Sequence, residues 1–61
     1  MNYVYVEIDW DYKCIDVFLS VDENIYHITG FEEDEWKEAG AFAAQFARSL
    51  NIIYKGDMTD G

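Results

Sequence analysis

Two consecutive runs of alternating apolar and polar residues constrain the fold of this chain most. Their apolar members are Val4, Val6, Ile8 and Trp10 in the first run, and Ile15, Val17, Leu19 and Val21 in the second. A period of two is typical of β-strands with one buried face. A two-residue turn at Asp11-Tyr12 would place Ile8 opposite Ile15. The other apolar residues of this first run, Val6 and Val4, would then lie opposite Val17 and Leu19, which supports this register. Asp-Tyr is not an ideal hairpin pair, so a longer loop is an alternative.

The rest of the chain predicts a third strand, a helix and a short fourth strand. Residues 25–28 follow a turn at 22–24 and complete a meander. Thr29 and Glu32 have capping-box spacing, which predicts a helix from there to Leu50. Its expected buried stripe is Trp36, Ala39, Ala43, Phe46, Ala47 and Leu50, with Phe42 at its edge. Asn51 is expected to end the helix in a left-handed conformation.

These elements predict an α+β fold, with a three-stranded antiparallel meander and one helix packed on one face. Residues 52–54 have the composition of a short fourth strand. We expect one compact domain over residues 1–55 and an acidic, flexible tail over residues 56–61. The sheet face opposite the helix is called the open face below.

The charge of the chain restricts its partners. Thirteen acidic residues against four basic ones give a formal net charge of −9 over 61 residues. Such a chain repels nucleic-acid phosphates and attracts a basic protein instead. One cysteine excludes an internal disulfide and agrees with a reducing compartment. No apolar run approaches the about 20 residues that span a bilayer, and no signal sequence is evident, so we expect a cytoplasmic protein without membrane contact.

No catalytic or cofactor-binding pattern is present, so we expect no enzyme activity and no cofactor. His27 and Cys14 are predicted on different strands, near opposite ends of the open face, too far apart for a catalytic pair. Glu7 and Asp16 are predicted directly opposite each other, and a hard cation such as Ca²⁺ or Mg²⁺ would relieve their repulsion. No loop has calcium-binding spacing, so we expect no metal and interpret the pair as part of a negative surface.

The candidate partner-binding residues are acids and aromatic residues. Glu7, Asp9 and Asp11 recur at intervals of about 6.8 Å along one strand face, which resembles the spacing of a polyanion. A second run of acids begins the helix, where the helix dipole alone explains one or two of them. Tyr3, Tyr5 and Phe18 are expected to form an exposed apolar patch on the open face. The full set is Tyr3, Tyr5, Glu7, Asp9, Asp11, Asp16, Phe18, Asp22, Glu23, Glu32, Glu33, Asp34, Glu35 and Glu38.

In size, acidity and compact sheet-plus-helix organisation, the chain resembles the small acidic inhibitors that phages make against host nucleases, such as anti-CRISPR and anti-restriction proteins. This resemblance implies an inhibitor that mimics nucleic acid, acts in the host cytoplasm and occupies the basic groove of a defence nuclease complex. The order of elements over residues 3–54, with the Ala-rich helix at residues 39–47, is also similar to the small βββαβ domains of HicB-type antitoxins. A toxin-neutralising or interaction module and a small structural homodimer are therefore the alternatives.

Overall fold

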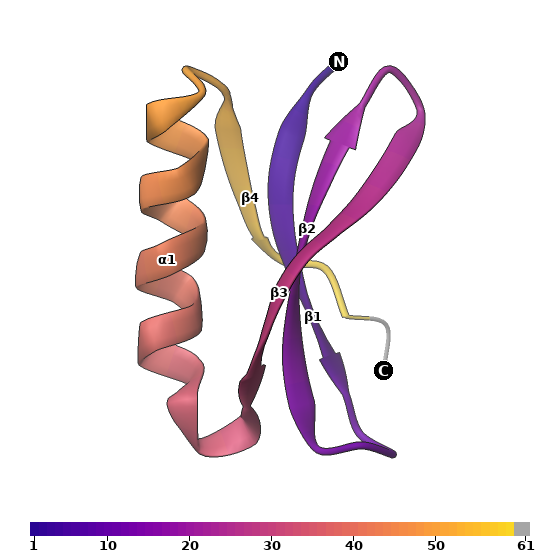
Figure 1. Ribbon diagram of the computed structural model, residues 1–61, viewed down its shortest axis with the longest axis vertical. Coiled ribbons are helices and arrows are strands. Elements are labelled where there is room, and N and C mark those ends of the chain that lie inside the picture. The colour runs from indigo at the N-terminus through magenta and orange to yellow at the C-terminus, as the bar shows by residue number, and fades with distance from the viewer. Residues whose placement is uncertain (60–61) are drawn as a thin grey trace.

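A computed structural model describes residues 1–59. Its elements are β1 (Tyr3–Asp9), β2 (Cys14–Val21), β3 (Asn24–Glu32), the short 3-10 helix η1 (Glu33–Glu35), α1 (Trp36–Ser49) and β4 (Ile53–Asp57). The helix α1 lies along one side of a twisted sheet (Figure 1). The predicted α+β fold, with three antiparallel strands, one helix and a short fourth strand, is confirmed.

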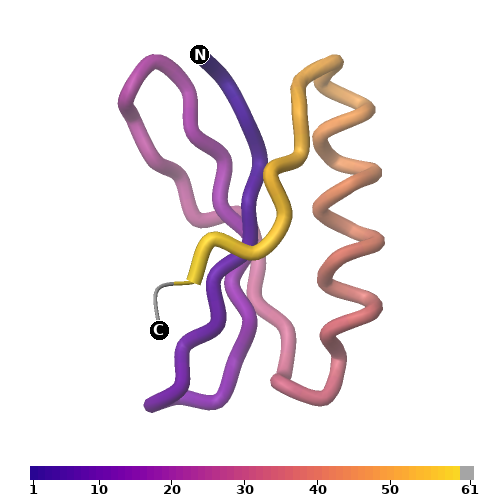
Figure 2. The backbone as a smooth tube through the Cα atoms, turned by 180° about the vertical axis from the view of Figure 1, so that it is seen from behind, coloured from indigo at the N-terminus to yellow at the C-terminus, as the bar shows by residue number. Residues whose placement is uncertain are grey.

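The four strands form a mixed sheet in the order β3-β2-β1-β4. β1, β2 and β3 pair in antiparallel fashion, whereas β4 pairs with β1 in parallel. A parallel partner needs a crossover connection. Here α1 provides it, because it carries the chain from β3 at one edge of the sheet to β4 at the other. Figure 2 shows β4 running beside β1 when the molecule is seen from behind.

The predicted register of the first hairpin is confirmed. Ile8 lies opposite Ile15, and the pairs Val6–Val17 and Val4–Leu19 follow along the ladder. Each of the β1 residues Val4, Val6 and Ile8 therefore lies opposite an apolar residue of β2, as a single buried face requires.

The loop of this hairpin is longer than the predicted two-residue turn. It comprises residues 10–13, and the Asp9 Oδ1 atom accepts hydrogen bonds from the backbone N–H groups of Asp11 and Tyr12, each at 3.1 Å. Lys13 has a positive φ of 54°. The prediction that Trp10 lies on the buried face was wrong, because the strand ends at Asp9 and Trp10 is 63% exposed in the loop.

The core lies between the sheet and α1. Its buried members are Val4, Val6, Ile15, Val17, Ala39, Ala43 and Ala47. The three alanines allow the helix backbone to lie close to the β-branched residues of the sheet. The prediction that the helix stripe is buried was wrong at its two ends, because Trp36 is 62% exposed and Leu50 is 46% exposed. Phe46 is partly buried against the core.

The helix begins later than predicted. Thr29 is not an N-cap, because it pairs with Val17 within β3, which extends to Glu32. Phe31, in the last part of β3, packs against the core, and this contact favours the extended strand. The capping box is formed instead by Glu32 and Glu35, whose carboxylate accepts the Glu32 N–H at 2.9 Å.

The helix ends as predicted, with Asn51 in the left-handed conformation. Asn51 has a φ of 59°, and its N–H donates to the Arg48 carbonyl at 3.0 Å. The Ile52 N–H donates to the Ala47 carbonyl, also at 3.0 Å. These two hydrogen bonds define a Schellman motif, which turns the chain toward β4.

The predicted boundary between the domain and its tail at residue 55 is too early. Gly56 and Asp57 belong to β4, and Gly56 has a φ of 79° that a residue with a side chain rarely adopts. Beyond β4, the Met58 N–H donates to the Val6 carbonyl and the Thr59 hydroxyl accepts the Ile8 N–H. The last two residues of the predicted tail, 60 and 61, lie outside the described residues.

Candidate functional site

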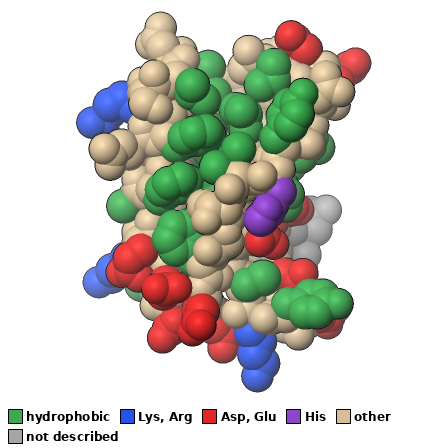
Figure 3. Space-filling view, viewed as in Figure 1, with side chains coloured by type: hydrophobic (Ala, Val, Ile, Leu, Met, Phe, Trp, Pro, Cys, Tyr) green, Lys and Arg blue, Asp and Glu red, His purple; other side chains and the backbone are tan. Residues whose placement is uncertain are grey.

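Most acids of the chain lie at one end of the molecule, where the β1–β2 loop meets the start of the helix. In the sheet, Cys14 pairs with Asp9 on one side and with Glu32 on the other. The Glu33 N–H donates to the Lys13 carbonyl at 3.2 Å, which joins η1 to the loop. We call this region the acidic pole; its members are Glu7, Asp9, Asp11, Asp16, Glu32, Glu33, Asp34, Glu35 and Glu38. Figure 3 shows carboxylates gathered at the lower end of the molecule.

The tertiary structure therefore unites two groups of acids that are separate in the sequence. One group comes from β1, the β1–β2 loop and β2, and the helix-start acids come from the end of β3, η1 and the first turn of α1. Among residues 1–59, the only basic side chain within salt-bridge distance of a carboxylate is His27, which contacts Asp16. The acids of the pole are thus not neutralised by lysine or arginine, and their negative potential extends into solvent.

Asp22 and Glu23 do not belong to the acidic pole. They form the two-residue loop between β2 and β3, at the opposite end of the sheet from the β1–β2 loop. Both have positive φ, 48° and 75°, as a type I′ hairpin turn requires. The Asp22 N–H donates to the Asn2 side chain at 3.2 Å. These two candidate residues therefore present a separate, smaller negative site at the β2–β3 turn.

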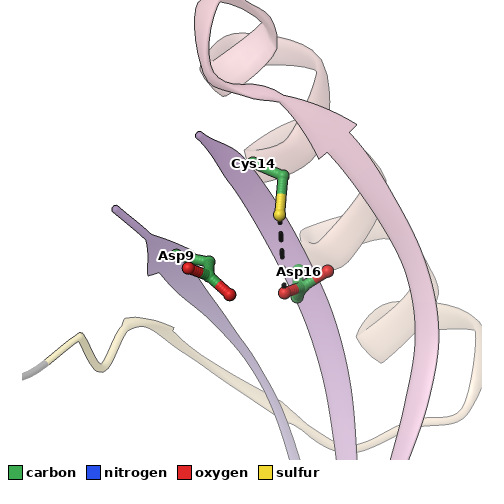
Figure 4. Close-up of side chains that lie close together, drawn as sticks. All are labelled: Asp9, Cys14 and Asp16. Atoms are coloured by element: carbon green, nitrogen blue, oxygen red, sulfur yellow. Dashed lines mark hydrogen bonds between the residues drawn. The ribbon is translucent and has the colours of Figure 1, made fainter. Parts of the chain in front are cut away.

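Asp16 is the central side chain of the open face. Glu7 lies directly opposite it on β1, as predicted. His27 contacts the Asp16 Oδ1 atom through Nε2 at 2.9 Å. The Cys14 thiol donates to Oδ2 at 3.9 Å, as Figure 4 shows. A Cβ atom on Gly30 would lie 3.2 Å from Oδ1, so glycine leaves room for this carboxylate. The expectation that His27 and Cys14 lie far apart was incorrect, because both contact Asp16.

This arrangement keeps the cysteine unreactive. Partial burial, followed by the nearby carboxylates of Asp16 and Asp9, raises the pKa of the Cys14 thiol. A nucleophilic cysteine needs the opposite effect, a cationic neighbour that lowers its pKa. The thiol therefore stays protonated at neutral pH.

Asp9, Cys14 and Asp16 are the residues whose arrangement comes nearest to a metal site. One ligand atom from each lies within 4.8 Å of the others. Figure 4 shows these side chains on two neighbouring strands. The Asp9 Oδ1 atom already holds the β1–β2 loop, and a thiolate would have to form in a negative environment. These three side chains alone do not complete the coordination shell of a divalent cation.

The aromatic patch of the open face is less exposed than predicted. Tyr5 is only 7% exposed, because its ring stacks on Phe18 at 5.3 Å and lies 5.7 Å from the Tyr3 ring. Burial, and then the charge of Glu7, raise the pKa of its hydroxyl. Lys55 Nζ lies 3.9 Å from the Tyr3 ring. The interpretation of Tyr5 as an exposed contact residue was therefore wrong, whereas Tyr3 and Phe18 remain half-buried.

A groove between α1 and the sheet opens beside the acidic pole, and sequence reasoning missed it. Its volume is about 690 Å³. Its floor is formed by Val6, Ile8 and Ile15, and α1 contributes a wall at Ala39 and Gly40. Trp10 and Trp36 line it, together with the carboxylates of Glu33, Asp34 and Asp57. The sequence did hold a signal for this groove. Trp10 and Trp36 each continue an apolar pattern, but one follows the end of β1 and the other is the first residue of α1.

No protein-family model matches this chain, and comparisons with curated proteins and with solved structures gave no match. Its function is therefore inferred from its own residues. Within residues 1–59, α1 is too short and too polar to cross a membrane.

Proposed function

We propose that this chain is an acidic inhibitor that occupies the nucleic-acid-binding groove of a basic protein, such as a host defence nuclease complex. The single observation that carries this proposal is the acidic pole. Nine carboxylates from the β1–β2 hairpin, the end of β3 and the start of the helix gather there, and no lysine or arginine among the described residues forms a salt bridge with them.

The proposed mechanism is competitive occlusion. A cluster of unneutralised carboxylates attracts a groove lined with lysine and arginine, and electrostatic steering raises the association rate by about 10- to 1000-fold. The extent of the protein, 29 × 21 × 17 Å, is comparable with the diameter of a nucleic-acid duplex. When this chain fills the nucleic-acid-binding groove of its partner, DNA or RNA is excluded from that groove without any chemical step.

The experiment is a capture from nuclease-treated bacterial lysate, followed by a competition assay on the purified captured protein. Fluorescence anisotropy of a labelled DNA or RNA duplex then measures whether this chain displaces the nucleic acid. We expect displacement that weakens as salt rises, because exposed charges are screened. A captured protein that retains its nucleic acid at saturating inhibitor would refute the proposal.

Two double variants locate the contact. Glu7→Gln with Glu38→Gln removes two charges from the acidic pole, and Asp22→Asn with Glu23→Gln removes two from the opposite end. We expect the first pair to slow association about tenfold at low salt and the second pair to have little effect. Equal rates for the two double variants would remove the acidic pole from the mechanism.

A HicB-like antitoxin or interaction module is a second candidate function. It is favoured by the element order β1-β2-β3-α1-β4 over residues 3–57. A captured small basic toxin, whose RNase activity this chain abolishes without competing for RNA, would favour this second candidate.

A further inference from the structure

The groove between α1 and the sheet combines an apolar interior with an acidic rim. Trp10 and Trp36 are 63% and 62% exposed at its edges, although tryptophan is usually among the more buried side chains. Lys37 Nζ lies 5.5 Å from the Trp36 ring, so a cation already rests against this indole. Exposed tryptophans beside an apolar pocket are typical of binding surfaces.

Gly40 keeps the groove open in the middle of the helix. A glycine inside a helix is less favourable than an alanine. Close packing does not require glycine here, because a Cβ atom at this position would meet only the Tyr54 hydroxyl oxygen, at 4.0 Å. A side chain at position 40 would instead take up space in the groove that Gly40 lines.

The charges around the groove determine which occupant fits. Glu33 and Asp34 belong both to the groove and to the acidic pole, and Asp57 lines the groove from β4. A second copy of this chain, with its own net charge of −9, is repelled by this rim. An uncharged apolar segment would leave three carboxylates without a partner. A segment that carries arginine or lysine beside a large apolar side chain satisfies both the rim and the floor.

We propose that this groove docks a segment of the basic partner in which a large apolar side chain adjoins arginine or lysine. The apolar side chain lies between Trp10 and Trp36, and the flanking cations face Glu33 and Asp34. This inference rests on the proposed function, because it supplies the apolar anchor that the buried Tyr5 cannot provide.

The two tryptophans of the chain give a direct assay, since both line the groove. The probe is the peptide acetyl-RLRFR-amide, titrated into the full chain while tryptophan emission is recorded. The matched control is acetyl-RARAR-amide, which has the same charge but no large apolar side chain. We expect RLRFR to shift the emission with a dissociation constant on the order of 10–100 µM, and RARAR to leave the emission unchanged.

A filled-groove variant provides the second control. Gly40→Leu should remain folded by circular dichroism and weaken RLRFR binding about tenfold or more, whereas Ala41→Leu, on an exposed position outside the groove, should bind normally. Intermolecular nuclear Overhauser effects between the indole protons and the peptide phenylalanine locate the peptide in the wild-type chain, even if a variant fails to fold.

Any result that differs from these expectations overturns the docking inference. Equal responses to RLRFR and RARAR would mean that charge alone attracts the peptides, which leaves the proposed inhibitor function intact. No response to RLRFR at about 1 mM would exclude the groove as a docking site. An emission shift with rising protein concentration alone would place a second copy there. Failure of the inhibitor function would appear separately, as a captured protein that retains its nucleic acid.

Discussion

Glu7→Gln should make this protein more stable, although it removes a charged surface residue. Glu7 lies directly opposite Asp16 in the β1–β2 ladder. No hydrogen bond or ion pair involves the Glu7 side chain within residues 1–59, and glutamine has nearly the same shape. The substitution therefore removes a like-charge repulsion without removing a contact that the structure shows.

The size of the effect follows from the geometry. Directly opposite side chains have Cβ atoms about 5 Å apart, and two unit charges at this separation in water repel by about 0.8 kcal/mol. Removal of this repulsion should raise the free energy of unfolding by about 0.5–1 kcal/mol at low salt. For a domain of this size, the melting temperature should rise by about 4–8 °C for each kcal/mol gained. At about 1 M salt the Debye length is near 3 Å, so most of the gain should disappear.

The assay is thermal unfolding by circular dichroism at low and at high salt. The control is Glu23→Gln, which removes one charge from the opposite end of the molecule, where Glu23 has no acid across a strand. We expect Glu23→Gln to change the melting temperature much less than Glu7→Gln. A Glu7→Gln protein that melts lower than the wild type, or a gain that persists at high salt, would refute the electrostatic reasoning.

Two further predictions concern the core and the pH dependence of stability. Val17 is fully buried, so Val17→Ala should lower the free energy of unfolding by about 2–3 kcal/mol in urea titration, out of a total of about 3–9 kcal/mol; a loss below about 0.5 kcal/mol would place Val17 outside the core. The folded-state pKa values of Cys14 and Tyr5 are raised above their ordinary values of 9.0 and 10.0, so both groups are harder to deprotonate in the folded chain than in the unfolded one. Their contribution to stability is therefore full below pH 9 and is lost as the pH rises through their raised values. Melting temperatures measured up to about pH 11 should decline, and the combined variant Tyr5→Phe with Cys14→Ser should decline less; an equal decline would assign the effect to other groups.

Local patterns were sufficient to predict the strands and their register. The alternation in residues 3–9 and 14–21 specifies which side of each strand is apolar, and the Ile8–Ile15 pairing follows because a shift by one residue would invert one face. Asn51 was recognisable as the helix end for a similar reason, since few residue types adopt a positive φ easily. Such properties depend on neighbours in the sequence.

Errors arose where distant segments decide the outcome. Alternation placed Tyr5 on the open face correctly, but the rings of Tyr3 and Phe18 bury it there. Thr29 had the composition of an N-cap, and the ladder with Val17 kept it in a strand instead. The local preference of a residue for one conformation is worth only a small free energy. The hydrogen bonds and side-chain contacts of a complete strand pair are worth more and therefore decide the conformation.

The amino-acid sequence by itself determined the charge of this protein, its α+β class and the alternation of its strands, because each of these is a property of composition or of nearest neighbours. Only the tertiary structure decided that the acids of Glu7 and Glu33 share one end of the molecule and that Trp10 and Trp36 line one groove. The acids meet because β3 pairs with β2, which sets Glu32 beside Cys14 at the β1–β2 loop, and the groove forms because α1 then packs against the sheet. The physical reason is that chain topology, and not local preference, sets which exposed side chains become neighbours.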